Sequence, residues 1–232
     1  MQLSAFDPLL LLLAALPGLL ICWYIYRTDK YEHESRVHIA LAFALGALGT
    51  LPIICMEAWL GSNLHHDWQP YWLKTIFESL LIAFSEEFIK LLPLLLIFYP
   101  RSFFNEPIDG IVYAVVIAMG FATTENILYA LKYGLGTTIL RAFTAVPAHG
   151  VFAIIMGYYA GLAKFRRQRQ VPLLAKGLLL AFAAHSVYDV LLFQKVYEGL
   201  IVLAIVLVWL GIYFEQELIR RHQNNSPFKK DE

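Results

Sequence analysis

The chain has 232 residues; 59% of them are hydrophobic, only 16% are charged, and the formal net charge is zero. Soluble globular domains are closer to half apolar and a quarter charged, so this composition excludes an ordinary soluble domain. Long apolar segments follow one another with short polar connections, and each is near the roughly 20 residues that a helix needs to cross a bilayer. The sequence therefore predicts a polytopic membrane protein.

Seven apolar segments are predicted to span the membrane: 7–26, 38–60, 73–99, 108–131, 138–163, 171–193 and 197–218. All seven should be helical, because an isolated strand cannot satisfy its backbone hydrogen bonds in lipid. Short connections make neighbouring helices antiparallel. We therefore predict one all-α transmembrane bundle over residues 1–219, followed by a polar, frayed, cytoplasmic tail over residues 220–232.

Basic residues are distributed unequally between the two sets of connections. One set carries Arg27, Lys30, Arg36, Arg101, Lys164, Arg166, Arg167, Arg169, Arg220, Arg221, Lys229 and Lys230. The other set carries only Lys74, Lys132 and Lys195. Because basic loops stay in the cytoplasm, the predicted orientation is N-terminus outside and C-terminus inside. No Lys or Arg precedes the first span, so we do not expect a cleavable signal peptide there.

Ionisable residues inside the predicted spans gather on four consecutive segments, the third to the sixth. They are Glu86, Glu87 and Lys90, with Glu78 nearer the outer end, then Glu125, then Arg141 and His149, then His185 and Asp189. The first, second and seventh spans have essentially none in their middles. A charge at the bilayer centre costs about 2.5–3.5 kcal/mol on insertion scales, so such residues usually face a cavity or one another. We expect them to converge between the midplane and the outer leaflet.

Helical spacing pairs some of these residues within one segment. Glu86 and Glu87 lie four and three residues before Lys90, so both can meet its ammonium group. An ion pair neutralised within this segment would explain one glutamate but would leave the other in need of a partner on another helix. His185 and Asp189 are also four apart. They form either a satisfied structural pair or a histidine that a carboxylate prepares for proton transfer.

A carboxylate and a histidine on either side of a water molecule can hydrolyse an amide: the carboxylate takes a proton from the water and the histidine stabilises the developing oxyanion. The sequence has no GxSxG, no HExxH and no candidate catalytic cysteine. Glu86, Glu125, His149, His185 and Asp189 also include enough oxygen and nitrogen donors for zinc or another divalent ion. Their spacing matches no familiar metal signature, so we expect no cofactor and keep a divalent metal ion as the open alternative.

Five ordered blocks over about residues 80–195 resemble the PrsW-type intramembrane proteases. They are SEEFIK at 85–90, EPIDGIVYA from Glu106, GFATTENILYA from Gly120, RAFTAVPAHGVFAIIMGYYAG from Arg141 and AHSVYDVLL from Ala184. That family belongs to a superfamily with the CAAX prenyl endopeptidases and bacteriocin-processing proteins. The resemblance implies that Glu86 and Glu87 are the glutamate pair on which activity depends. His185 and Asp189 match the HxxxD block, and His149 matches the PAH histidine. Glu125 stands where the prenyl endopeptidases have a histidine, so its role is open.

The resemblance also implies a function. Such enzymes make the first cleavage of a single-span anti-sigma factor on its extracytoplasmic side, in a stress response of the bacterial cell membrane. We therefore predict a glutamic-type intramembrane endopeptidase whose partners are a membrane-anchored protein and the lipid bilayer, and no nucleic acid. A non-catalytic membrane scaffold and a proton-coupled transporter are the alternatives. Paired broken helices or repeats, which would favour a transporter, are not evident in the sequence.

Overall fold

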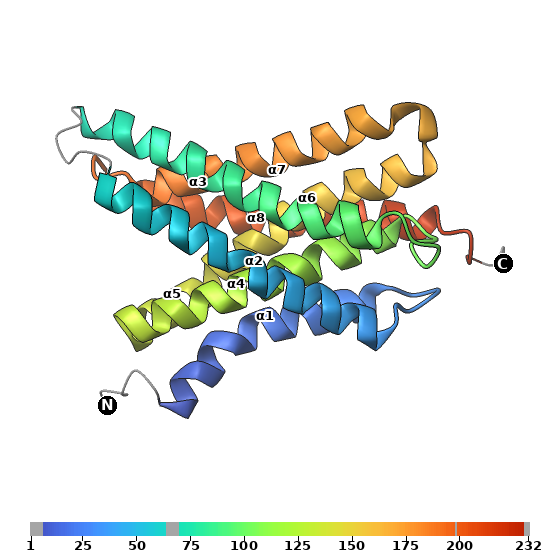
Figure 1. The fold of residues 1–232 in the computed structure, drawn as a ribbon, viewed down its shortest axis with the longest axis horizontal. Coiled ribbons are helices and arrows are strands. Elements are labelled where there is room, and N and C mark those ends of the chain that lie inside the picture. Colours follow the sequence, from blue (N-terminus) through green and yellow to red (C-terminus); the bar gives the residue numbers. More distant parts are fainter. Residues whose placement is uncertain (1–6, 64–69, 198, 230–232) are drawn as a thin grey trace.

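The computed structural model describes residues 7–63, 70–197 and 199–229. Within these ranges every regular element is a helix, and short non-helical connections join them, as Figure 1 shows. The helices are α1 (Pro8–Thr28), α2 (Arg36–Asn63), α3 (Tyr71–Pro93), a π-helical turn η1 (Leu94–Phe98), α4 (Ile108–Tyr133), α5 (Leu135–Phe143), α6 (Ala145–Phe165), a 3₁₀ turn η2 (Arg167–Arg169), α7 (Gln170–Phe193) and α8 (Gly199–Asn224). The predicted helical membrane bundle is confirmed.

Six helical segments of the described chain are long and apolar enough to cross a membrane. They are α1, α2, α4, the stretch Leu135–Phe165 that contains α5 and α6, α7 and α8. The third predicted span corresponds to α3 and η1, which are long enough but carry five ionisable side chains (Lys74, Glu78, Glu86, Glu87 and Lys90). The count of seven spans and their orientation stay predictions.

Helix α4 forms the centre of the bundle. In its most apolar stretch 78% of the residues are buried, against 17% in α8. Small residues allow this close packing, because in lipid helices associate through contact between backbones. A Cβ added at Gly120 would lie 2.0 Å from the backbone oxygen of Phe43 in α2. One added at Gly157 in α6 would lie 2.4 Å from the backbone oxygen of Gly110. The Gly157–Gly161 pair thus brings α6 against the start of α4.

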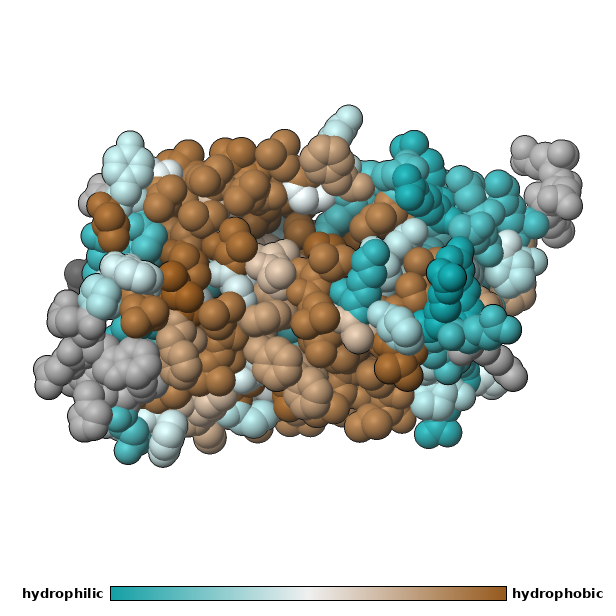
Figure 2. Space-filling model, turned by 90° about the horizontal axis from the view of Figure 1, so that it is seen from above, coloured by the Kyte–Doolittle hydropathy of each residue, from teal (hydrophilic) through white to brown (hydrophobic). Residues whose placement is uncertain are grey.

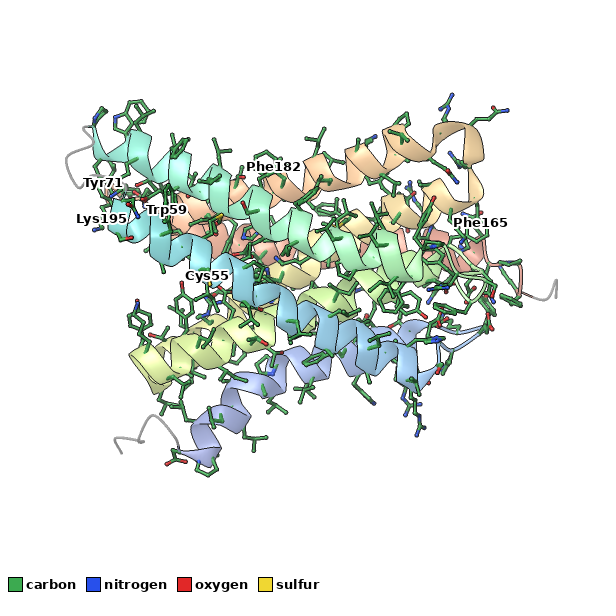
Figure 3. All side chains as sticks on the ribbon, viewed as in Figure 1. Cys55, Trp59, Tyr71, Phe165, Phe182 and Lys195 are labelled. Atoms are coloured by element: carbon green, nitrogen blue, oxygen red, sulfur yellow. The ribbon has the colours of Figure 1, made fainter. Side chains whose placement is uncertain are left out.

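Helix α3 lies beside α7, and the two run in opposite directions (Figure 1). Phe84 of α3 packs edge-on against Phe182 of α7, with ring centroids 5.6 Å apart. At the end of the bundle where α3 begins, Lys195 lies over the ring of Tyr71 at 5.0 Å (Figure 3). These contacts fix α3 and α7 side by side along their length, which matters because each carries part of the polar set.

The fifth predicted span, 138–163, lies within an apolar stretch long enough to cross a membrane, but a break that the sequence analysis did not predict divides it into two helices. The helix breaks at Thr144, whose backbone angles (φ −125°, ψ −77°) are not helical. Pro147 has no N–H to donate to the carbonyl of residue 143, so an uninterrupted helix would lose a hydrogen bond there. The break separates α5, whose last turn holds Arg141, from α6, whose second turn holds His149.

The two ends of the bundle differ in polarity. Figure 2 shows a broad apolar surface and a dense hydrophilic region at the end that holds the α1–α2 connection and the C-terminus. The connections that carry most of the basic residues lie at this end. The predicted frayed tail is wrong for residues 220–224, because α8 continues to Asn224. His222 is fully buried there and stacks on Tyr158 at 4.3 Å between ring centroids.

Candidate active site

Helix α3 supplies two buried carboxylates and one buried ammonium group. Glu86, Glu87 and Lys90 are all less than 5% exposed. Lys90 Nζ lies 3.0 Å from Glu86 Oε2, 2.9 Å from Glu87 Oε1 and 3.0 Å from Nδ1 of His149. An ammonium group has three N–H donors, so these three contacts use its whole capacity. Lys90 is therefore held at the junction of α3 and α6.

His149, near the start of α6, connects Lys90 to a second ion pair. Its Nε2 lies 3.1 Å from Glu125 Oε2 in α4, and the same oxygen lies 2.8 Å from Arg141 Nη2 in α5. Lys90 can only donate, so Nδ1 of His149 accepts and Nε2 carries the proton toward Glu125. This arrangement makes His149 a neutral imidazole with a fixed tautomer. The break at Thr144 allows Arg141 and His149 to approach Glu125 from two separate helices.

His185 of α7 completes the network on the other side. Its Nδ1 lies 2.9 Å from Glu87 Oε1, and its Nε2 lies 3.5 Å from Asp189 Oδ2. The ring stacks on Phe152 of α6, with centroids 4.7 Å apart. Nδ1–H donates to Glu87, whereas the contact to Asp189 is too long for a strong hydrogen bond. The Nε2 face of His185 is thus oriented by Asp189 but still available to another group.

A cavity of about 250 Å³ lies against this network. Glu86, Glu125, Arg141, His149, His185 and Asp189 line its inner part. Glu57, Leu60 and Gly61 near the end of α2, Glu78 in α3, and Leu192 and Phe193 at the end of α7 also line it. The cavity therefore extends from the network toward the end of the bundle where α2 and α7 end and α3 begins. This volume accommodates water and a short piece of extended chain.

All six residues predicted for the site lie in this one constellation: Glu86, Glu87, Glu125, His149, His185 and Asp189. Donor atoms of Glu86, Glu87, His149 and His185 lie within 4.8 Å of one another. The prediction of convergence between the third and sixth spans matches this geometry, and the catalytic roles stay predictions. The predicted site residues did not include Lys90, although its spacing from both glutamates had already indicated contact. They also did not include Glu57, and the signal that could have found it is a lone acid near the C-terminal end of an apolar span.

Comparison with known proteins gives the chain its family. A family model described as "PrsW family intramembrane metalloprotease" matches residues 34–213. Proteins named Protease PrsW are similar over most of their length. The one from Geobacillus kaustophilus (strain HTA426) is 37% identical over 82% of this chain and 84% of its own. That from Bacillus subtilis (strain 168) is 34% identical over 76% and 79%, and that from Clostridioides difficile (strain 630) is 32% identical over 94% and 92%.

The chain belongs to the PrsW family. No solved structure matches it. Membership supports a peptidase in a multi-pass membrane protein, and the six apolar helical segments agree with that location.

The description of the PrsW family as metalloproteases raises the question of whether these residues fit a metal ion. Two carboxylates and two imidazoles are a donor set that zinc accepts. However, the Lys90 ammonium already lies 2.9–3.0 Å from donor atoms of Glu86, Glu87 and His149. A divalent cation bound by the same atoms would be a second positive charge within a few ångströms of the first. The site as arranged therefore does not fit a metal ion together with Lys90.

A second buried acidic cluster lies at the opposite end of the helical bundle of this PrsW-family protein. Its members are Asp29, Glu34, Glu106 and Asp109. Tyr113 donates a hydrogen bond to Glu34. Burial, followed by the neighbouring Glu106 carboxylate, raises the pKa of Asp29 to about 8. Burial also raises the pKa of Glu34 to about 7, although the Tyr113 hydrogen bond opposes the shift. Pro107 immediately precedes α4 and Asp109 lies in its first turn, where Asp109 accepts from the backbone N–H groups of Asn105 and Glu106.

Proposed function

We propose that this protein is an intramembrane endopeptidase that cleaves a single-span membrane protein of the anti-sigma factor type. We place it in the bacterial cell membrane and its cut on the extracytoplasmic side. The observation that carries the proposal is the meeting of Glu86, Glu87, His149 and His185 around Lys90 at the inner wall of a cavity. A structural ion pair would need one carboxylate for one lysine. Here a cavity, two histidines and further carboxylates accompany the pair.

Glu86 is our candidate for the general base. Its side chain lines the cavity, whereas Glu87 is not among the lining residues. A water molecule beside Glu86 would pass a proton to its carboxylate while the water oxygen attacks the carbonyl carbon of the substrate. The proton would then go to the amine as the C–N bond breaks. Glu87, which contacts both Lys90 and His185, would hold these two groups in place.

His185 is our candidate for the group that stabilises the oxyanion. Its Nε2 faces Asp189 and the cavity. Because Nδ1–H already donates to Glu87, a proton on Nε2 makes His185 an imidazolium, whose Nε2–H can donate to the oxygen of the tetrahedral intermediate. Asp189 orients the ring and favours a proton on Nε2. His149 and Glu125, with Arg141, would fix Lys90 from the other side and form part of the cavity wall.

The positive charge in this mechanism comes from Lys90 and the His185 imidazolium rather than from a metal ion. The Lys90 ammonium group lies between the two glutamates, where it stabilises their ionised forms. This assignment departs from the metalloprotease description of the family and rests on the three hydrogen bonds of Lys90.

Two observations support the proposed side of cleavage. The cavity extends toward the end of the bundle opposite the basic loops, and basic loops are cytoplasmic in most membrane proteins. The juxtamembrane segment of a single-span substrate on the extracytoplasmic side could therefore enter it. Such a segment has to be locally extended for water to reach its carbonyl groups.

Reconstituted protein tests the proposal directly. Wild-type protein in liposomes is mixed with tagged single-span anti-sigma factors, and the products are mapped by mass spectrometry. We expect one discrete cut near the extracytoplasmic end of the substrate span, and none with Glu86→Gln. If properly folded wild-type protein makes no cut, the proposal is wrong. A cut on the cytoplasmic side would contradict only the proposed side of cleavage. Binding without cleavage would favour the scaffold alternative.

A further inference from the structure

Glu57 is a carboxylate of the cavity that the proposed mechanism does not use. It lies near the end of α2, and Leu60 and Gly61, three and four residues later, line the same cavity. This spacing places all three on one face of α2. Glu57 also shares the cavity with Arg141 and Tyr129. Glu57 therefore belongs to the outer part of the cavity, through which a substrate would reach Glu86.

Every other carboxylate that lines the cavity has a cationic or histidine partner. The pairs are Glu78 with Lys74 at 3.7 Å, Glu86 with Lys90 at 3.0 Å, Glu125 with Arg141 at 2.8 Å and Asp189 with His185 at 3.5 Å. Within residues 7–63, 70–197 and 199–229, no Lys, Arg or His nitrogen lies within 4.0 Å of the Glu57 carboxylate. Glu57 thus gives the cavity a carboxylate that no basic side chain of the described residues pairs.

An unpaired carboxylate at this depth is costly, because a charge inside a membrane span needs a partner or water. A cation that arrives with the substrate would provide that partner. A Lys or Arg at the end of a membrane span packs its aliphatic stem on apolar surface and extends its charged group toward water. A charge-assisted hydrogen bond to such a group is stronger than a neutral one.

We propose that Glu57 is a specificity-determining residue that binds a Lys or Arg side chain of the substrate next to the scissile bond. This inference rests on the proposed function and names a feature of its substrates: a basic residue in the extracytoplasmic juxtamembrane segment. Glu57 acts on substrate position, so its removal should raise KM more than it lowers kcat.

The experiment uses a tagged single-span anti-sigma factor that wild-type protein cleaves. Each residue within about six positions of the cut is changed in turn to Lys, Gln or Glu, and kcat/KM is measured in proteoliposomes. We expect one position at which kcat/KM for the Lys substrate exceeds that for the Gln substrate by about tenfold, a factor typical of a hydrogen bond between charged groups. Glu at that position should be cleaved least.

Two protease variants assign the preference to Glu57. With Glu57→Gln, the ratio of kcat/KM for the Lys substrate to that for the Gln substrate should fall from about ten to about one. With Glu57→Lys, the order should reverse, and the Glu substrate should be cleaved fastest. The charge swap is a result that a purely structural role of Glu57 would not produce. Glu78→Gln is the matched control, because Glu78 lines the same cavity but is already paired with Lys74.

The outcomes separate this inference from the proposed function. If wild-type protein cleaves but no position prefers Lys over Gln, the inference is wrong and the peptidase proposal stands. Loss of the preference in Glu78→Gln as much as in Glu57→Gln would also overturn it, because the cause would then be the charge of the cavity as a whole. If wild-type protein cleaves no anti-sigma factor, the proposed function is wrong, and the inference about Glu57 is wrong with it.

Discussion

Replacing each glutamate of the α3 pair by glutamine tests the division of roles between them. Both variants should lose cleavage while the protein still inserts and folds. A general base typically contributes a hundredfold or more to the rate, so Glu86→Gln should reduce kcat by at least about a hundredfold. Glu87→Gln should reduce it by a similar factor for another reason: Lys90 and His185 lose the carboxylate that positions them.

The two variants should differ in stability. Glu86 makes one contact with a basic side chain within 3.2 Å, to Lys90, whereas Glu87 makes two, to Lys90 and His185. A hydrogen bond to a charged group is worth about 1 kcal/mol more than one to a neutral group. Glu86→Gln should therefore lower the free energy of unfolding by about 1 kcal/mol and Glu87→Gln by about 2 kcal/mol. Both side chains are buried, so solvent does not weaken these contacts much.

Cleavage is measured in proteoliposomes with a tagged single-span substrate, and unfolding by denaturant titration in detergent. Glu86→Asp keeps a carboxylate as proton acceptor on a side chain that is one methylene group shorter. It should retain more activity than Glu86→Gln. Glu217→Gln is the control, since Glu217 lies on the exposed part of α8 near residues 220 and 221. Wild-type activity in both Gln variants would refute the glutamate-base mechanism. Activity in Glu86→Gln with none in Glu87→Gln would transfer the role of base to Glu87.

Three further predictions concern the histidine, the metal and the distant acidic cluster. His185→Ala should be nearly inactive and Asp189→Asn impaired but measurable, because Asp189 only orients its partner; kcat/KM values in the reverse order would contradict these roles. EDTA or 1,10-phenanthroline should leave cleavage intact, whereas loss of activity that added zinc restores would show a metal enzyme. The folded protein keeps a proton on Asp29 between about pH 4 and pH 8 that the unfolded chain releases, so stability should fall as pH rises through this window. Asp29→Asn cannot ionise, so its thermal midpoint should fall less between pH 5 and pH 9; an equal fall would rule out Asp29 as the cause.

The sequence was sufficient for the fold class and for six of the polar residues of the candidate site, but the prediction did not include Lys90 or Glu57 among them. Apolar length predicts membrane helices, and the cost of charges in lipid singles out the few segments whose ionisable residues need one another. Spacing of three and four residues also predicted the contacts of Lys90 with Glu86 and Glu87, which the structure contains. These inferences succeed because they depend on one helix at a time, or on the simple requirement that buried charges be paired.

Contacts between helices needed the tertiary structure. Lys90 with His149, Glu87 with His185, and Arg141 with Glu125 each join different helices. Helices such as α4 are apolar on every side, so their sequence gives no preferred face, and lipid provides no hydrophobic contrast to select one. Their rotation is decided instead by backbone contacts at small residues, such as Gly120 against α2.

The break at Thr144 and the place of Glu57 illustrate the same limit. Pro147 is visible in the sequence, but a proline can bend a helix or end it, and only the packing of α5 beside α1 and α4 selects the break. Glu57 looks like an isolated acid near the end of an apolar span. The face of α2 that it shares with Leu60 and Gly61 turns toward the cavity because Gly46 and Gly120 bring α2 against α4 at a fixed rotation. The sequence determined which charges lie in the membrane, and helix packing decided which of them meet.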